Sequence, residues 1–226
     1  MTFYMHFTWV YFCIAFGIML FLHLLMSLQN KNFFTMHVVV RKFSILDLEF
    51  PPSAQDLTNF IKDIFNLPGN LSQKTIKALR RQLLIDFIFM PALYGAIFIL
   101  SMKVSMMMTY FGHKLFAIFA WMQFLAWLCD ITENIYLLNK IRPDPVVSKP
   151  IVHKSYEILE MIKWGIPLLA GVCSIAAIFY FWLVGRYSYH SLNFIFITMV
   201  ELTMFFIIKR LITKSEEKQL EEFLKQ

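Results

Sequence analysis

Four carboxylates lie inside long apolar segments of the chain, where ionisable side chains are unfavourable. They are Asp86, Asp130, Glu133 and Glu201. A charged side chain near the centre of a membrane span costs about 2.5–3.5 kcal/mol on insertion scales, so each acid calls for a partner or a function. Asp130, Glu133 and Asn134 are spaced at i, i+3 and i+4, so they project from one face of a helix.

These acids fall in the same half of the membrane if their segments are antiparallel helices. Asp86 lies near the start of one span and the Asp130 group near the end of the next, His23 reaches a similar depth, and Glu201 is somewhat deeper. We therefore expect an inner-leaflet acidic pocket, provided that these spans are adjacent. The candidate ligand- or proton-binding residues are His23, Asp86, Asp130, Glu133, Asn134 and Glu201.

Three further residues are expected to support this pocket. Pro91 lies one turn beyond Asp86, where it removes a backbone hydrogen bond and favours a kink that opens space for a ligand. The phenols of Tyr94 and Tyr136 are candidate hydrogen-bond partners for the acids.

Four interpretations of the acidic cluster remain open. In a structural one, the polar groups hydrogen-bond between helices, or a basic residue reaches inward from the interface to pair with Asp86 or Asp130. The basic residues within reach are Arg80, Arg81, Lys140 and Lys163. The others are transport coupled to a proton or cation, a metal-dependent enzyme acting on a lipid head group, and a face for another membrane subunit.

Four common catalytic and nucleotide-binding motifs are absent from the sequence. It has no H-E-x-x-H pattern, no G-x-S-x-G elbow, no Walker loop and no dinucleotide fingerprint. The three cysteines, Cys13, Cys129 and Cys173, show no metal-type spacing. The sequence therefore identifies neither a cofactor nor a metal. It favours a non-enzymatic protein that binds a cation, a proton or a lipid head group, with a lipid-modifying enzyme and a structural subunit of a membrane complex as alternatives.

Composition and hydropathy place the acids in a membrane. Apolar residues make up 58% of the 226, the mean hydropathy is +0.60, and the charges fall in blocks between long uncharged stretches. About 20 apolar residues cross the hydrocarbon as a helix. We predict a single all-α membrane domain over 1–226, a bundle of five transmembrane helices at about 7–28, 83–102, 115–138, 164–184 and 192–208.

Basic residues predict the orientation of these spans. They are concentrated in three segments, 29–82, 139–163 and 209–226, and only Lys103, Lys114 and Arg186 lie on the other side. The positive-inside rule puts the three rich segments in the cytosol, so the N-terminus is expected outside and the C-terminus inside. The net charge of +6 is explained by this topology, and no nucleic-acid partner is expected.

The cytosolic segment 29–82 is expected to carry short amphipathic helices. Leu57, Phe60, Ile61, Ile64 and Phe65 form one helical face after a capping-box-like start at Ser53. This face either lies on the membrane or packs on the ends of the spans. The basic residues that follow, Lys74, Lys77, Arg80 and Arg81, are candidates for binding anionic lipid. The residues 209–226 are expected to form a charged helical tail.

Partners other than the bilayer are left open between a membrane subunit and a second copy of the chain. The membrane itself is either a bacterial inner membrane or a eukaryotic endomembrane or plasma membrane.

Overall fold

The computed structural model describes residues 9–36 and 39–224, without the side chains of 216–224. The expected start of the first span at residue 7, the external placement of the N-terminus and the end of the tail at 225–226 lie outside the described residues. The described chain is mostly helical.

Five of its helices are long and apolar enough to cross a membrane, which confirms the helical, multi-pass membrane architecture. They are α1 (Trp9–Gln29), α4 (Leu71–Met107), α5 (Tyr110–Lys140), α6 (Pro150–Leu183) and α7 (Ser191–Leu224). Several extend beyond the expected apolar segments, because polar and charged residues continue the helix at one end. The extension is longest at the end of α7 and at the starts of α4 and α6.

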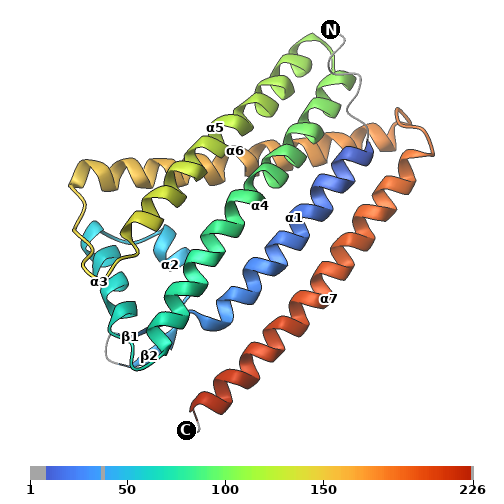
Figure 1. Cartoon of the computed structure of the whole chain (residues 1–226). Helices are drawn as coiled ribbons and strands as arrows, with labels where there is room; N and C mark the ends of the chain where they lie inside the picture. Colours follow the sequence, from blue (N-terminus) through green and yellow to red (C-terminus); the bar gives the residue numbers. More distant parts are fainter. Residues whose placement is uncertain (1–8, 37–38, 225–226) are drawn as a thin grey trace.

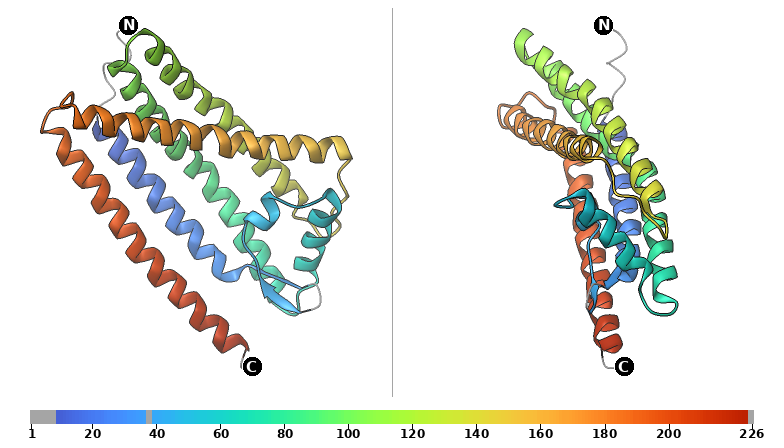
Figure 2. Two further views of the ribbon diagram at one scale, coloured as in Figure 1. Left: turned by 180° about the vertical axis from the view of Figure 1, so that it is seen from behind. Right: turned by 90° about the vertical axis from the view of Figure 1, so that its left-hand side faces the viewer.

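Four of the long helices run side by side in the order α5, α4, α1 and α7 (Figure 1). The helix α6 crosses one face of this layer obliquely and packs on α5 and α4 (Figure 2). The helix α7 packs mainly on α1, at the edge of the layer. This arrangement brings the second, third and fourth spans together and leaves the fifth apart from them.

A small folded unit, here called the cap, covers one end of the helices. It comprises residues 33–36 and 39–67 and follows a short 3₁₀ turn, η2 (Asn30–Asn32). Its elements are a hairpin of β1 (Phe34–Met36) and β2 (Val40–Lys42), then α2 (Leu46–Glu49) and α3 (Ala54–Phe65). The two strands are antiparallel, with Phe34 opposite Lys42.

The amphipathic face of α3 packs inward. Leu57, Ile61 and Ile64 are buried in a core that also holds Leu79 of α4 and Tyr156 of α6. Of the two arrangements expected for this face, the structure shows packing on the ends of the spans and not burial in a lipid surface. The cap thereby packs on the starts of α4 and α6.

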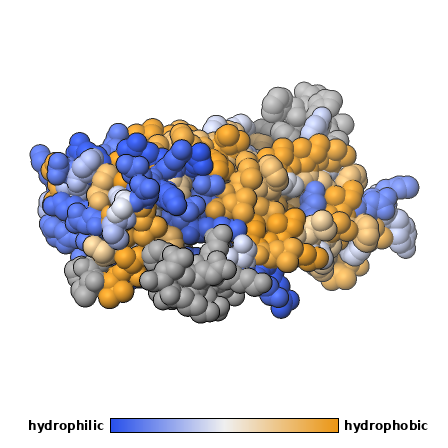
Figure 3. All heavy atoms as spheres, turned by 60° about the horizontal axis from the view of Figure 1, so that its bottom comes forward, coloured by the Kyte–Doolittle hydropathy of each residue, from blue (hydrophilic) through white to orange (hydrophobic). Residues whose placement is uncertain are grey.

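Local sequence explains where α3 begins and ends. The Ser53 hydroxyl accepts a hydrogen bond from the Asp56 backbone N–H at 3.1 Å, as expected of an N-cap. After α3, Gly69 has a φ of +58°, in the left-handed region that glycine adopts without strain. Hydrophilic residues gather at the cap end, and a largely apolar surface covers the spans (Figure 3).

Candidate functional site

The side chain of Lys163, on α6, lies at the centre of a cluster of four acids close to the cap. Its ammonium donates a hydrogen bond to Glu133 Oε2. The same Nζ lies 3.5 Å from an oxygen of each of the three other acids, namely Glu49, Asp130 and Glu160. One buried cation is therefore shared by four carboxyl groups. We call these five residues the Lys163 cluster.

Three elements supply the acids. Asp130 and Glu133 project from one face of α5, and Glu160 lies one turn before Lys163 on α6. Glu49 is the last residue of α2 and comes from the cap. Because α5 and α6 pack against each other beneath the cap, these three sources meet at one point.

Hydrogen bonds extend the Lys163 cluster into α4. Asn134 donates to Asp86 Oδ2 at 2.6 Å, and the Tyr94 hydroxyl donates to Asp130 Oδ2 at 2.9 Å. Of the residues singled out from the sequence, Asp86, Tyr94, Asp130, Glu133 and Asn134 are thus brought together by α4 and α5. Pro91 lies within α4, which continues as a helix through it.

The structure does not bring His23 and Glu201 into this cluster. The ring of His23 contacts Phe89 and Phe205. Glu201 lies against α1, so close to Gly17 that a side-chain carbon there would be 2.9 Å from Glu201 Oε1. His23 belongs to α1 and Glu201 to α7, and these two helices pack on each other at the edge of the layer.

The remaining candidates have other partners. The hydroxyl of Tyr136 is paired with Ser148 at 2.7 Å, and not with an acid. Arg80 donates to the backbone carbonyl of Ile141, and Lys140 donates to that of Val146. The side chains of Lys74, Lys77, Arg80 and Arg81 are exposed along the start of α4.

Sequence reasoning missed Glu49 and Glu160 and named Lys163 only as one of four basic residues within reach. Glu160 and Lys163 precede the apolar part of the fourth span, but the helix begins already at Pro150 and carries both residues to the level of Glu133. Their i, i+3 spacing was the available signal. Nothing in the sequence pattern points to Glu49, because its position depends on how the cap folds.

Each of the three glutamates has one oxygen near Lys163 and one without a hydrogen-bond partner among the described residues. The second oxygens are Glu49 Oε2, Glu133 Oε1 and Glu160 Oε1. Glu160 Oε2 and Asp130 Oδ1 also lack a hydrogen-bond partner in the described part of the chain, and each lies 3.5 Å from Lys163 Nζ. Glu133 is 0% exposed and Glu160 is 1% exposed. An unpartnered polar group in a buried site costs free energy, so these oxygens call for a proton or a cation.

Glu49 is the cluster member that the cap contributes. Burial raises the pKa of its carboxyl above the ordinary value; the charge of Lys163 opposes this rise, and those of Glu160 and Asp130 add to it.

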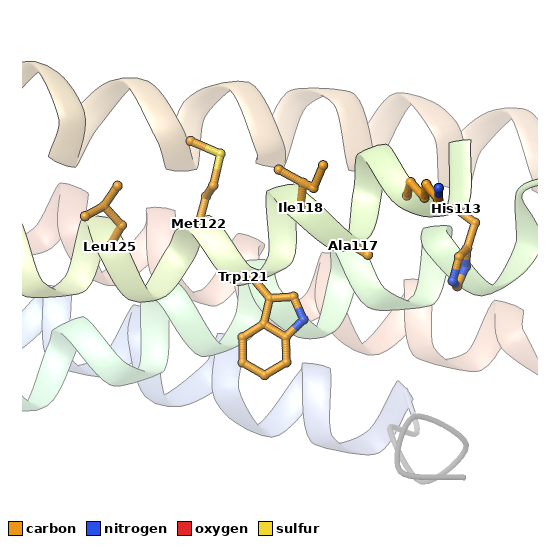
Figure 4. Close-up of a pocket in the computed structure, with 7 residues that line it drawn as sticks. His113, Ala117, Ile118, Trp121, Met122 and Leu125 are labelled. Carbon is orange, nitrogen blue, oxygen red and sulfur yellow. The ribbon is translucent and has the colours of Figure 1, made fainter. Parts of the chain in front are cut away.

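A shallow apolar groove lies on the other half of α5. It is lined by the side chains shown in Figure 4, which run from His113 to Leu125 along that helix. None of the acids of the Lys163 cluster lines it.

No protein-family model matches the chain, and no curated protein or solved structure is significantly similar to it. The fold and the five apolar helices define the class as a multi-pass, helical membrane protein.

Replacing Lys163 by Met should destabilise the protein by about 3–5 kcal/mol, because it leaves four buried acids without their ammonium. The free energy of unfolding, measured by titration in mixed detergent micelles, checks this. Lys154→Met, an exposed position on the same helix, is the control and should change stability by no more than about 0.5 kcal/mol. Equal stability of the two variants would contradict the central role of Lys163.

Glu49 should make stability depend on pH. A carboxyl whose pKa is raised in the folded state stabilises the folded protein at low pH. This contribution is full below the unfolded-state pKa of about 4.3 and is lost as the pH rises through the raised folded-state pKa. Wild type and Glu49→Gln should therefore melt at similar temperatures near pH 4, and wild type should fall below the variant as pH rises. A constant difference across this range would show that Glu49 titrates normally.

Proposed function

We propose that this chain is a non-enzymatic membrane protein that binds a small cation, either a proton or a metal ion, at the Lys163 cluster. The observation that carries the proposal is the set of carboxyl oxygens without hydrogen-bond partners, among the residues that the structure describes, beside a single shared ammonium. In a site of low dielectric, one ammonium balances only one of the four carboxylates. Further positive charge must therefore come from bound protons or from a metal ion.

Charge also distinguishes among the ligands that the sequence left open. Phosphate head groups are anionic and would be repelled by four carboxylates, so the cluster suits a cation better than a lipid head group. An anionic lipid fits instead the exposed basic residues Lys74, Lys77 and Arg81 on α4. The ammonium in the cluster comes from this chain, so a partner subunit need not supply it.

We further propose that the Lys163 cluster lies in the cytosolic half of the membrane. The basic segments adjoin the cap end of the helices, and the positive-inside rule assigns that end to the cytosol. A cation site at this depth, close to one surface, suits proton- or cation-coupled transport.

The cation proposal is tested by the melting temperature of the detergent-purified protein. Wild type should be stabilised by lower pH or by at least one of Na⁺, K⁺, Mg²⁺, Ca²⁺ and Mn²⁺, because a ligand that binds only the folded state stabilises it. The response should be weakened in Glu133→Gln and retained in Glu157→Gln, whose side chain on α6 is 53% exposed. If the melting temperature of wild type responds to neither protons nor any of these cations, the proposal is wrong and the cluster has a purely structural role.

Orientation has a separate test in sealed vesicles. A cysteine at Gln55, exposed on α3, should react with a membrane-impermeant maleimide only when the cytosolic side faces outward, whereas one at Tyr189, 89% exposed in the α6–α7 loop, should react only in the opposite orientation. The native cysteines are replaced by serine in both variants. The reverse labelling pattern would overturn the orientation and place the cluster in the outer leaflet.

The spacing of Glu49, Glu133 and Glu160 also favours one enzymatic alternative. These residues are close enough to hold a metal ion, as a metal-dependent lipid-modifying enzyme would require. Incubating the metal-supplied protein with a bacterial lipid extract, followed by mass spectrometry, separates the two functions. A lipid product that wild type forms and Glu133→Gln does not would establish the enzyme.

A further inference from the structure

Three glutamates from three different elements converge within the Lys163 cluster. One ligand oxygen from each of Glu49, Glu133 and Glu160 lies within 4.8 Å of the other two. Oxygens that bind one hard divalent cation at about 2.0–2.6 Å are at most about 5 Å apart. The three side chains are thus already gathered to the size of such a site.

The buried oxygens in this group are unpartnered. Glu133 and Glu160 are almost completely buried, and Oε1 of each has no hydrogen-bond partner among the described residues. The opposite oxygen of Glu133 receives the Lys163 hydrogen bond, and that of Glu160 lies 3.5 Å from the same nitrogen. Lys163 thus lies near one oxygen of each glutamate, and the other oxygen of each has no hydrogen-bond partner among the described residues.

The ligand atoms indicate the class of cation. All three are carboxylate oxygens, the ligands that suit Mg²⁺, Mn²⁺ and Ca²⁺, and no histidine or cysteine belongs to the group. A divalent ion together with Lys163 supplies three positive charges to four carboxylates. This balance is closer to neutrality than Lys163 alone provides.

Glu49 connects the site to the cap. Its side chain is 13% exposed, more than any other member of the Lys163 cluster, so it marks the side from which an ion arrives. The adjacent residue, Leu48, accepts a hydrogen bond through its backbone carbonyl from Tyr156 of α6 at 3.1 Å. An ion shared by Glu49 and the two span glutamates adds a second connection between α2 and α6.

We infer that Glu49, Glu133 and Glu160 form a site for a hard divalent cation, and that an ion bound there fastens the cap onto α5 and α6. This inference rests on the proposed cation-binding function and specifies both the ion class and its structural effect.

The experiment uses Mn²⁺ and the full-length protein in detergent. Electron paramagnetic resonance of free Mn²⁺ measures binding, and hydrogen–deuterium exchange of residues 44–50 measures fastening of the cap. Wild type should bind about one Mn²⁺, and exchange in 44–50 should slow when it does. Glu160→Gln should bind at least about tenfold more weakly, because it removes a ligand. Glu157→Gln, three residues earlier on the same helix, should bind as wild type does.

Glu49→Gln tests the link to the cap. It should weaken Mn²⁺ binding and abolish the slowing of exchange in 44–50. The inference is overturned if wild type binds no Mn²⁺, if Glu157→Gln weakens binding as much as Glu160→Gln, or if Glu49→Gln behaves as wild type. If wild type binds no Mn²⁺ but its melting temperature still responds to pH in a way that depends on Glu133, the divalent site is rejected and the proposed function is retained. Absence of any response to protons or cations would reject both.

Discussion

The arrangement of the helices around the acids depends on one buried ammonium. Lys163 is the common neighbour of four carboxyl groups that come from the cap, α5 and α6. Charges taken out of water are tolerated only where an opposite charge and hydrogen bonds compensate them. The close packing of α5 on α6, and of the cap on both, is therefore an electrostatic requirement as much as a hydrophobic one.

A second layer of hydrogen bonds orients the acids. Tyr94 holds Asp130 from α4, and Asn134 holds Asp86 across the α4–α5 contact. These contacts hold one oxygen of Asp130 and one of Asp86, and Lys163 holds one oxygen of Glu133. Within the described residues, oxygens without a hydrogen-bond partner remain on Asp130 and on all three glutamates. The cap completes the enclosure, since its core places Glu49 over the site. Packed helices and the cap thus surround a small region that holds four carboxyl groups and one ammonium.

Sequence patterns predicted the spans and two of the four acids of the Lys163 cluster, for identifiable physical reasons. Apolar length predicted the five helices, and helical spacing put Asp130, Glu133 and Asn134 on one face. Spacing within a helix carries no information about which helices are neighbours, so Glu201 was grouped with acids from which the α1–α7 pairing separates it. Glu49 was not predictable, because its position is set by the tertiary fold of the cap and not by any local pattern.

The order of these residues along the chain has a consequence for biosynthesis. Glu133 precedes the lysine that binds it by 30 residues, so the third span is synthesised before its counter-ion. At about 5–20 residues per second, the interval lasts roughly 2–6 seconds. During that time Asp130 and Glu133 must stay in contact with water, a proton or the insertion machinery. The third span of this protein can therefore reach its final packing only when the fourth supplies Lys163.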